Sequence, residues 1–324
     1  MLGGCGDDGL EGEGAAQDPS SCTAVVPDPF VEVQEAVDAL PSEGGTVCIR
    51  AGLHETVGVH VNRSNVGILG EPGALLRLAD GANRPVLLLG PDDEVPTTSV
   101  SNVSIAGLEI DGNRGAQTSE TDPLRPWIRN NGIDARSVEG LWIDQVDVHD
   151  ARSGGLVVSW NSRDVFLSRS AFRSNFYDGF ALYASEDIVV SEFVSSANDA
   201  AGLSLDNALS DVQFPDGRIE ANGDVGIFAR DSTDLTFSDL VIADNVSHGA
   251  FLSHQVPGNG SGVERLLFVG CRFLDNGGYG LWLASPSADS PGNAIVASQF
   301  AGNGAGAINL DPGAELQQVA VVFP

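Results

Sequence analysis

Apolar and polar positions alternate after a glycine that recurs along most of the chain. The spacings between successive aligned glycines are 23, 24, 23, 24, 23 and 31 residues. The first and third residues after each glycine are apolar or small, which is the period-2 pattern of a strand with one buried face. The aligned glycines are Gly132, Gly155, Gly179, Gly202, Gly226, Gly249 and Gly280.

Each repeat carries a second apolar segment, such as Leu141–Ile143 or Val165–Leu167, which predicts a second strand. An Asp often precedes this segment. An Asn stands four residues before the next aligned glycine, and stacked Asn side chains can hydrogen-bond along an axis as a ladder. We therefore expect structural roles for the Asn set, which is Asn175, Asn198, Asn222, Asn245 and Asn276, and for the Asp set, which is Asp164, Asp187, Asp211 and Asp234.

A repeat of about 23 residues cannot bury its own apolar face, so the repeats must stack. The pattern predicts an all-β solenoid, and the fixed Leu/Asn frame of leucine-rich repeats is absent. Near the start, Asp28-Pro29 is a favoured helix opening, and apolar residues follow at helical spacing from Phe30 to Leu40. A strand is expected over Thr46–Ile49. The helix would cover the open end of the solenoid core.

A short amphipathic helix followed by Gly-Gly-Thr-Val and a strand resembles the start of pectate-lyase-like proteins. The repeats are similar to those of pectate lyases, polygalacturonases and mannuronan C5-epimerases, over roughly residues 30–324. The resemblance implies a right-handed single-stranded parallel β-helix with an N-terminal capping helix. We expect one β-helix domain over residues 21–324.

Residues 1–20 are rich in Gly, Asp, Glu and Ser, which is typical of a disordered tether. Leu2-Gly3-Gly4-Cys5 resembles the lipobox of bacterial lipoproteins, which implies lipidation of Cys5. Such a protein is exported to the cell envelope or secreted. In an oxidising compartment Cys22 and Cys48 are able to form a disulfide, whereas Cys271 lies in a repeat strand and is expected to be buried.

The chain holds 16 basic and 45 acidic residues, with a net charge of −29. All bases are Arg, because the sequence contains no Lys, and this excludes a lysine base or Schiff base. Such an acidic surface repels nucleic acid and anionic membranes, so membrane association is expected only through a lipid anchor. A polyanionic substrate requires cations or a local Arg patch.

The fourth residues after successive glycines predict the candidate catalytic column. Tyr183, Asp206 and Arg230 are expected to be neighbours on one exposed strip, because stacked strands lie about 4.8 Å apart. Other candidate proton-transfer or orienting groups flank this strip: Asp178, His248 and His254. In a lyase or C5-epimerase a base removes the proton next to a uronate carboxylate, and Arg neutralises that carboxylate.

Two other chemistries use the same acidic side chains. Asp178, Asp199 and Asp206 could hold Ca²⁺, which binds several carboxylate oxygens. A glycoside hydrolase needs two carboxyl groups at a set separation, and Asp178 with Asp206 is a candidate pair.

Candidate substrate-binding residues are the aromatic and polar side chains on the same face and in a long insert, residues 112–131. Shorter inserts at 255–263 and 285–293 could wall a groove. Trp142 belongs to a second strand, so packing is expected for it. The substrate-binding candidates are Arg136, Trp160, Tyr177, Asn207, Phe228, Phe251, Trp282 and Trp127.

The favoured hypothesis is an exported lyase or C5-epimerase acting on a uronic-acid-containing polysaccharide. Tyr177-Asp178-Gly179-Phe180 is loosely similar to the Tyr-Gly-Phe-Asp-Pro-His motif of mannuronan C5-epimerases, but the Pro-His is missing. Ser247-His248-Gly249 is similar to the Gly-His-Gly of polygalacturonases, without the other motifs of that family. The alternatives are a non-catalytic carbohydrate-binding protein or adhesin, and a glycoside hydrolase. No cofactor other than Ca²⁺ is indicated, and the oligomeric state stays open.

Overall fold

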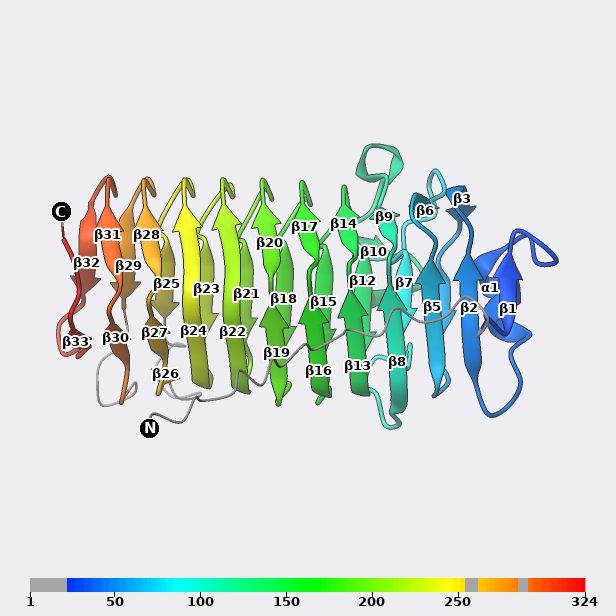
Figure 1. Cartoon of the computed structure of the whole chain (residues 1–324), viewed down its shortest axis with the longest axis horizontal. Helices are drawn as coiled ribbons and strands as arrows, with labels where there is room; N and C mark the ends of the chain where they lie inside the picture. Colours follow the sequence, from blue (N-terminus) through cyan, green and yellow to red (C-terminus); the bar gives the residue numbers. More distant parts are fainter. Residues whose placement is uncertain (1–21, 254–261, 285–290, 324) are drawn as a thin grey trace, which may run out of the picture.

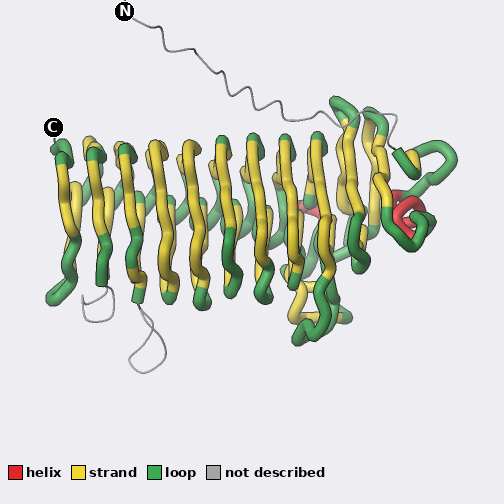
Figure 2. Tube along the Cα trace, turned by 60° about the horizontal axis from the view of Figure 1, so that its bottom comes forward, coloured by secondary structure: helices red, strands yellow, loops and turns green. Residues whose placement is uncertain are grey.

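The structure is a computed structural model, and it describes residues 22–253, 262–284 and 291–323. The chain forms a right-handed parallel β-helix, as predicted. Its strands stack side by side along one axis, with the first strands at one end and β32 and β33 at the other (Figure 1). Loops connect the strands at the corners of each coil (Figure 2). The predicted tether at residues 1–20 and the lipobox Cys5 lie outside the described residues.

One face of the solenoid is a ten-stranded parallel sheet, which we call sheet B. It contains the strands that follow the aligned glycines. Its strands are β4 (Val59–Val61), β7 (Leu87–Leu89), β12 (Ile133–Arg136), β15 (Leu156–Ser159), β18 (Phe180–Tyr183), β21 (Leu203–Asp206), β23 (Ile227–Arg230), β25 (Ala250–Ser253), β29 (Tyr279–Leu283) and β32 (Gly306–Leu310).

The remaining parallel strands form a second, 21-stranded sheet, sheet A, which has two rows. The long strands β22 and β24 pair with both rows and join them. The first row holds β1 (Ala24–Val26), β2 (Gly45–Ile49), β5 (Val66–Gly70), β8 (Val100–Ala106), β13 (Val138–Asp144), β16 (Arg163–Ser168), β19 (Ile188–Ser191), β22 (Leu209–Glu220), β24 (Ser232–Ala243), β26 (Val263–Glu264), β27 (Leu267–Val269), β30 (Ala294–Val296) and β33 (Gln317–Val319). The second row holds β3 (Gly52–Thr56), β6 (Ala74–Leu78), β9 (Glu109–Asp111), β14 (Asp147–His149), β17 (Ala171–Arg173), β20 (Phe193–Ser196), β28 (Arg272–Leu274) and β31 (Gln299–Ala301).

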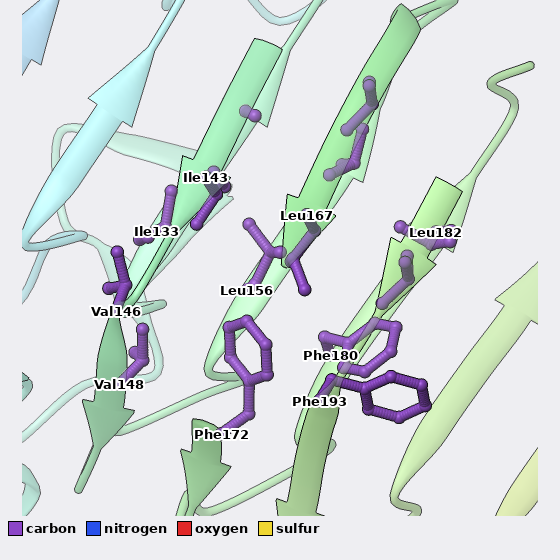
Figure 3. Close-up of a cluster of buried hydrophobic side chains, with 14 of the residues drawn as sticks. Ile133, Ile143, Val146, Val148, Leu156, Leu167, Phe172, Phe180, Leu182 and Phe193 are labelled. Carbon is purple, nitrogen blue, oxygen red and sulfur yellow. The ribbon is translucent and has the colours of Figure 1, made fainter. Parts of the chain in front are cut away.

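The hydrophobic core runs through the solenoid between the sheets. The first and third residues after each aligned glycine are buried, as the alternation predicts; Leu156 and Val158 are 0% exposed. Strands of sheet B and of both rows of sheet A contribute side chains that point into the same interior, among them Ile143, Phe172 and Phe180 (Figure 3). Phe172 and Phe180, from different rows, lie 5.2 Å apart between ring centroids. Stacking therefore buries what no single coil could cover.

The aligned glycine is required by the close approach of neighbouring coils. A Cβ on Gly226 would stand 2.6 Å from the carbonyl oxygen of Gly249 in the next coil, and one on Gly202 would stand 2.7 Å from that of Gly226. Real Cβ atoms do not come so close to a carbonyl. The recurring glycine thus allows the coils to stack at this corner.

The predicted Asn ladder is present and buried. The Nδ2 group of Asn198 donates to Oδ1 of Asn222 at 2.9 Å, and Asn222 donates in the same way to Asn245 at 2.9 Å. The ladder starts at Asn175 and extends one coil beyond the prediction, to Asn303. Each Asn also donates to a backbone carbonyl or accepts a backbone N–H, so polar corners are satisfied inside the core.

The capping helix α1 (Val33–Asp38) covers the first coil, but it begins later than the sequence predicted. Val33, Ala36 and Val37 face the core and are at most 1% exposed. The predicted start at Asp28-Pro29 was wrong. The N–H of Phe30 instead donates to the carbonyl of Val25 in β1 at 3.4 Å. The N-cap is Glu32, whose N–H donates to Oε2 of Glu35 at 3.4 Å.

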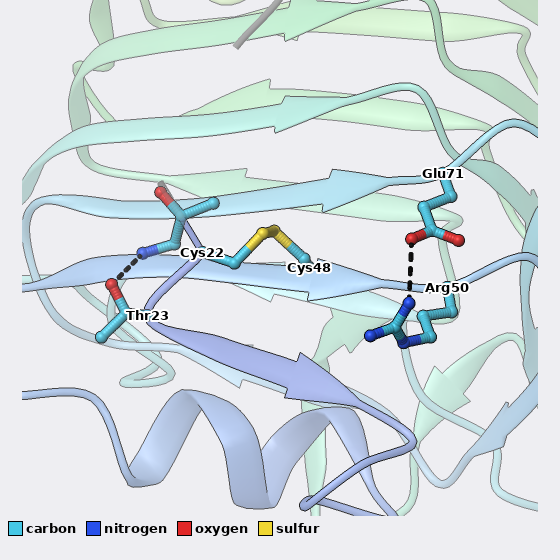
Figure 4. Close-up of a disulfide and its surroundings, with 6 residues drawn as sticks. Cys22, Thr23, Cys48, Arg50 and Glu71 are labelled. Atoms are coloured by element: carbon cyan, nitrogen blue, oxygen red, sulfur yellow. Dashed lines mark hydrogen bonds and ion pairs between the residues drawn. A yellow bond between two sulfur atoms is a disulfide. The ribbon is translucent and has the colours of Figure 1, made fainter. Parts of the chain in front are cut away.

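A disulfide joins Cys22, just before β1, to Cys48 in β2, with their Cα atoms 5.7 Å apart (Figure 4). This is the pair that the sequence singled out. It fastens the start of the described chain to the first full coil. The thiol of Cys271 is buried in the core, as expected, and burial raises its pKa to about 12. In the described part of the chain, no helix is long and apolar enough to cross a membrane.

Candidate active-site cleft

A cleft of about 620 Å³ lies on the outer face of sheet B, over strands β12, β15 and β18. The long insert supplies its wall through the antiparallel hairpin of β10 (Thr121–Asp122) and β11 (Arg125–Arg129). The cleft gathers charged, hydroxyl and aromatic side chains in a small space. Its lining includes Trp127, Arg129, Asn131, Asp134, Arg136, Ser153, Trp160, Tyr177, Asp178, Tyr183 and Asn207.

The hairpin is held against the solenoid by polar contacts. The fully buried carboxylate of Asp122 accepts hydrogen bonds from the N–H of Leu124 at 2.9 Å and from Arg125 at 2.8 Å. Arg125 also contacts Asp92, and the indole N–H of Trp127 donates to the Asp92 carbonyl at 2.9 Å. These contacts fix the position of β11, and with it the side chains that β11 presents to the cleft.

Arg129 is the central cation of the cleft. Its Nε–H donates to Oγ of Ser153 at 2.8 Å, and its guanidinium lies 4.6 Å from the ring centroid of Tyr177. Its contact with Glu120 is longer, at 3.4 Å. Nearly half of the side chain is exposed, so Arg129 retains N–H groups to offer a ligand carboxylate.

Asp178 lies on the rim just before β18. Burial raises the pKa of its carboxyl group to about 6, although the N–H of Ala201, which donates at 3.0 Å, and the charge of Arg129 both lower it. A carboxyl group with a pKa near 6 is able to exchange a proton near neutral pH.

The phenol of Tyr183, at the end of β18, is kept protonated. Burial and the nearby Asp178 raise its pKa to about 12. The hydroxyl donates to Oγ of Ser204 in the next coil at 3.2 Å. Tyr183 is therefore a hydrogen-bond or proton donor in the cleft at ordinary pH, and not a free base.

Asp134 in β12 is a second carboxyl group in the cleft, which the sequence analysis did not select. The residue is 5% exposed, and burial raises its pKa to about 6, against the lowering effects of Arg136, of the Asn131 hydrogen bond at 3.1 Å and of Arg129. Its position, the second after the glycine, is occupied by Val157 and Ala181 in the next coils. A carboxylate between the apolar Leu88 and Val157 of the adjacent coils was the available signal.

Arg136 closes the floor of the cleft beside Asp134. Its guanidinium donates to the carbonyls of Pro91 at 3.1 Å and Glu94 at 3.3 Å, and it lies 5.7 Å from the ring of Trp160. The residue is only 2% exposed, and burial lowers its pKa. Arg136 therefore acts mainly as a fixed charge behind the cleft wall.

The raised pKa of Asp134 predicts a pH-dependent stability change in Asp134→Asn. The folded-state pKa of about 6 exceeds the ordinary value of 3.8. Between about pH 4 and pH 6 the unfolded chain has released this proton while the folded protein still holds it, so the wild type loses folding stability as the pH rises over this range. Asn cannot ionise. We expect Asp134→Asn to match wild type at pH 4 and to be more stable at pH 8, by on the order of 2–3 kcal/mol. Urea denaturation at both pH values measures this, and an equal difference at the two pH values would contradict it.

Several predicted site residues line the cleft together: Asp178, Tyr183, Tyr177, Arg136, Trp160, Trp127 and Asn207. Asp206 and Arg230 are adjacent to Tyr183 in the coil order, as predicted. However, Asp206 is buried rather than exposed, at 4% exposure, and Nε of Arg230 donates to its two oxygens at 3.0 and 3.1 Å. This pair lies beyond the cleft lining.

His248, Phe228, Phe251 and Trp282 form a half-buried aromatic cluster on sheet B, nearer its C-terminal end. Rings of Phe228 and Phe251 lie 6.1 Å apart, and those of Phe251 and Trp282 5.1 Å apart. Nδ1 of His248 accepts the N–H of Tyr279 at 2.9 Å, and burial lowers the His248 pKa. His248 is thus neutral and structurally engaged, and it does not line the cleft. His254 lies outside the described residues.

The candidate calcium ligands Asp178, Asp199 and Asp206 have separate partners. Asp199 pairs with Arg114 at 3.0 Å, Asp206 with Arg230, and Asp178 with a backbone N–H. Within the described ranges, the group of three His, Cys, Asp or Glu residues whose ligand atoms lie within 4.8 Å of one another is Asp111, His149 and Asp150, away from the cleft.

Trp142 packs against a neighbouring ring, as expected, but on the outer face of sheet A and not in the core. Leu141 and Ile143 point into the core, so the period-2 alternation of β13 turns Trp142 outward, and its side chain is 44% exposed. Its ring stacks on that of Phe166 in the next coil, with 6.0 Å between centroids and an interplanar angle of 11°.

A family model described as "Periplasmic copper-binding protein (NosD)" matches residues 106–310, which is well over half of the chain and includes every cleft strand. The chain belongs to the NosD family. The sequence has no significant match among curated proteins. The family assignment therefore rests on this match, and the matched range covers the hairpin and the strands of sheet B from β12 to β32 of this NosD-family chain.

Solved structures with the same fold show how widely it is used. ORF18 of Geobacillus virus E2 is 14% identical, with a TM-score of 0.71, over 90% of this chain and 57% of its own length. The A-module of Azotobacter vinelandii mannuronan C-5 epimerase AlgE4 is 18% identical, with a TM-score of 0.57, over 90% and 92% of the two chains. A double mutant of the periplasmic alginate epimerase AlgG is 12% identical, with a TM-score of 0.57, over 91% and 83%. At these identities the likeness establishes the fold of the NosD-family chain, and not its activity.

Proposed function

We propose that this chain acts on a uronic-acid-containing polysaccharide in the cleft, by removing the proton next to the uronate carboxylate. The observation that carries the proposal is the convergence of Arg129, Asp178 and Tyr183 in one cleft, with carboxyl groups whose pKa is raised to about 6. Similarity in fold to two alginate epimerases supports it. The outcome is either β-elimination or C5 epimerisation.

The local charge supports an anionic substrate despite the net charge of −29. Arg129 presents an exposed guanidinium, and Arg136 adds a buried positive charge to the floor. Trp127 and Trp160 offer partly exposed rings for stacking on sugar faces. A uronate carboxylate would bind Arg129, whose charge also stabilises the enolate-like state that forms when the proton leaves.

The proton transfers follow from the protonation states. Ionised Asp178 takes the C5 proton, and the electron pair moves toward the uronate carboxylate beside Arg129. In elimination, the C4–O bond then breaks, a C4=C5 bond forms, and protonated Tyr183 supplies a proton to the leaving oxygen. In epimerisation, protonated Tyr183 instead supplies a proton to C5 on its opposite face, and no C–O bond breaks.

A glycoside hydrolase is the second candidate, favoured by the presence of two carboxyl groups, Asp134 and Asp178, with pKa values of about 6 in one cleft. One of them would remain protonated as the acid while the other acts as base or nucleophile. The sequence suggested Asp178 and Asp206 as this pair. In this mechanism, Asp134 takes the place of Asp206 as the partner of Asp178. A protein that binds polysaccharide without catalysis is the remaining alternative.

The family description names copper, and the donor atoms of this chain limit the form that it could hold. Cu(I) is selected by thiolate and thioether ligands. Among the described residues, the free Cys271 is buried as a thiol bonded to backbone carbonyls. His54 and His60 lie on different strands of one coil, and His149 and His248 lie on two other coils. Asp111, His149 and Asp150 form a nitrogen and oxygen donor set, which suits Cu²⁺ rather than Cu(I).

We further propose export to the periplasm or the cell envelope, with a lipid on Cys5 as the anchor and residues 1–20 as the tether. The family description, the periplasmic AlgG and the Cys22–Cys48 disulfide support export. Calcium is retained only as a variable in the assay that follows.

The test of activity is absorbance near 235 nm during incubation with a panel of uronic-acid polysaccharides, with and without calcium. A rise indicates the unsaturated product of β-elimination. Exchange of the C5 proton for deuterium in D₂O, followed by NMR, detects epimerisation, and new reducing ends without absorbance detect hydrolysis. If no polysaccharide gives any of these signals, the catalytic proposal is wrong and binding alone remains.

A further inference from the structure

A second candidate site lies on the second row of sheet A, away from the cleft. Strands β9 and β14 are neighbours, and their last residues, Asp111 and His149, stand in register. Asp150 follows His149, and its Oδ2 lies 2.8 Å from Nδ1 of the imidazole. Ligand atoms of these three residues lie within 4.8 Å of one another. From this geometry we propose that Asp111, His149 and Asp150 bind one divalent transition-metal ion, held by nitrogen and oxygen ligands.

The imidazole of His149 lies between two carboxylates. The two ring nitrogens both face carboxylates: Nδ1 lies 2.8 Å from Oδ2 of Asp150, and Nε2 lies 3.0 Å from Oε1 of Glu109. A neutral imidazole has one N–H and one acceptor nitrogen. An imidazolium donates to both carboxylates, whereas in the neutral ring one of the two contacts sets an acceptor against an acceptor. A metal ion at Nδ1 would take the place of the proton between the ring and the Asp150 oxygen.

The arrangement has the outer contacts expected of a metal-binding His. When Nε2–H donates to Glu109, Nδ1 is left as the ligand atom, and a carboxylate behind the imidazole is the usual partner of such a residue. Ligand atoms at 2.0–2.2 Å from one ion stand about 2.8–3.6 Å apart when their bonds meet at 90–109°. The Nδ1–Oδ2 separation of 2.8 Å is at the lower end of that range. His149 is 9% exposed, so its orientation is fixed by packing.

Neighbouring cations orient the carboxylates without occupying every oxygen. Arg77 lies 3.3 Å from Oδ2 of Asp111, and Arg114 lies 3.8 Å from Oδ1 of Asp150. The N–H of Asn113 donates to Oδ1 of Asp111 at 2.7 Å. Each carboxylate oxygen has two lone pairs, so Asp111 and Oδ2 of Asp150 retain capacity for a metal ion. One imidazole with two carboxylates suits Zn²⁺ or Cu²⁺ better than Ca²⁺, which prefers an all-oxygen set.

The experiment is a calorimetric titration of Zn²⁺ into the full chain after EDTA treatment, at pH 7.5, with 150 mM NaCl and 1 mM Ca²⁺ to suppress binding to the acidic surface. We expect one Zn²⁺ per chain. His149→Gln and Asp111→Asn should each weaken binding by at least about tenfold, and Glu109→Gln by about 10–100-fold. In a parallel titration, Cu²⁺ electron paramagnetic resonance should show nitrogen coupling that His149→Gln removes.

His54→Gln is the matched control, because His54 is another coil His, bonded only to the Arg50 carbonyl. It should leave Zn²⁺ binding unchanged. Circular dichroism melts show whether each variant folds. If His149→Gln does not fold, Asp111→Asn takes its place as the test of the site. Wild-type-like binding in the folded variants, or only weak binding that all variants share, overturns the site. The result is independent of the polysaccharide assay, since the two sites lie on different sheets.

Discussion

Asp178→Asn is expected to lower turnover by about 10²–10⁴-fold, the usual contribution of a positioned general acid or base. The substitution keeps the shape of the side chain, and an Asn oxygen can still accept the Ala201 N–H. The folded protein should melt within a few degrees of wild type. The measurement is the initial rate on whichever polysaccharide is active, beside a thermal melt of both proteins.

The pH profile of the wild type shows whether Asp178 acts as a base or as an acid. Its carboxyl pKa is raised to about 6. A base must be ionised, so a lyase or epimerase should gain activity as the pH rises through about 6. An acid must be protonated, so a hydrolase that uses Asp178 as its acid should lose activity over the same range. This limb should be missing from any residual activity of Asp178→Asn.

Asp164→Asn is the matched control for Asp178→Asn. Asp164 is an exposed residue of β16 on sheet A with a φ of +54°, which Asn adopts readily. The same chemical change there should leave the rate within about twofold of wild type. If Asp178→Asn is as active as Asp164→Asn, the proposed proton transfer by Asp178 is excluded.

Asn222→Ala is expected to cost roughly 3–5 kcal/mol in the free energy of unfolding, because it strands several buried polar groups at once. Asn222 is 0% exposed. Its Oδ1 accepts from the backbone and side chain of Asn198, and its Nδ2 donates to Ser195 and Asn245. Urea denaturation followed by circular dichroism gives the change in midpoint and slope.

Asn303→Ala makes the same change at the end of the ladder. Asn303 is only partly buried, so water can replace lost hydrogen bonds there. We expect a loss of about 1–2 kcal/mol. Equal losses at the two positions would show that burial of the ladder does not contribute to stability as argued.

The fold was predictable because it repeats, whereas the site was not. Alternation after each glycine identifies the buried side of sheet B, and the same alternation in β13 would have placed Trp142 outward had it been applied there. The cleft depends instead on where the hairpin of β10 and β11 lies against the coils, which no repeat encodes. Arg129 was visible in the insert, but its reach to Ser153 and Tyr177 is a tertiary contact.

Asp134 was missed for a related reason. The candidate column was read along the fourth position, where Tyr183, Asp206 and Arg230 carry the polar groups. Two of those three residues, the partly exposed Arg230 and the buried Asp206, form an ion pair, which sequence spacing cannot distinguish from a reactive pair. Burial decides the pKa of Asp134 and Asp178, and burial at a corner depends on the insert that packs there.

The uniform rise of the coils makes the solenoid a molecular ruler. Each coil advances the strands by about 4.8 Å, so the distance from the cleft to the aromatic cluster around Trp282 is set by the number of coils between them. Removing or duplicating one complete coil, such as the segment from Gly202 to Gly226, would preserve the glycine contacts and the Asn register on both sides. The spacing between the two surfaces can therefore change in discrete increments without rebuilding either, which is a simple route by which such proteins adapt to longer or shorter chains of a polymer.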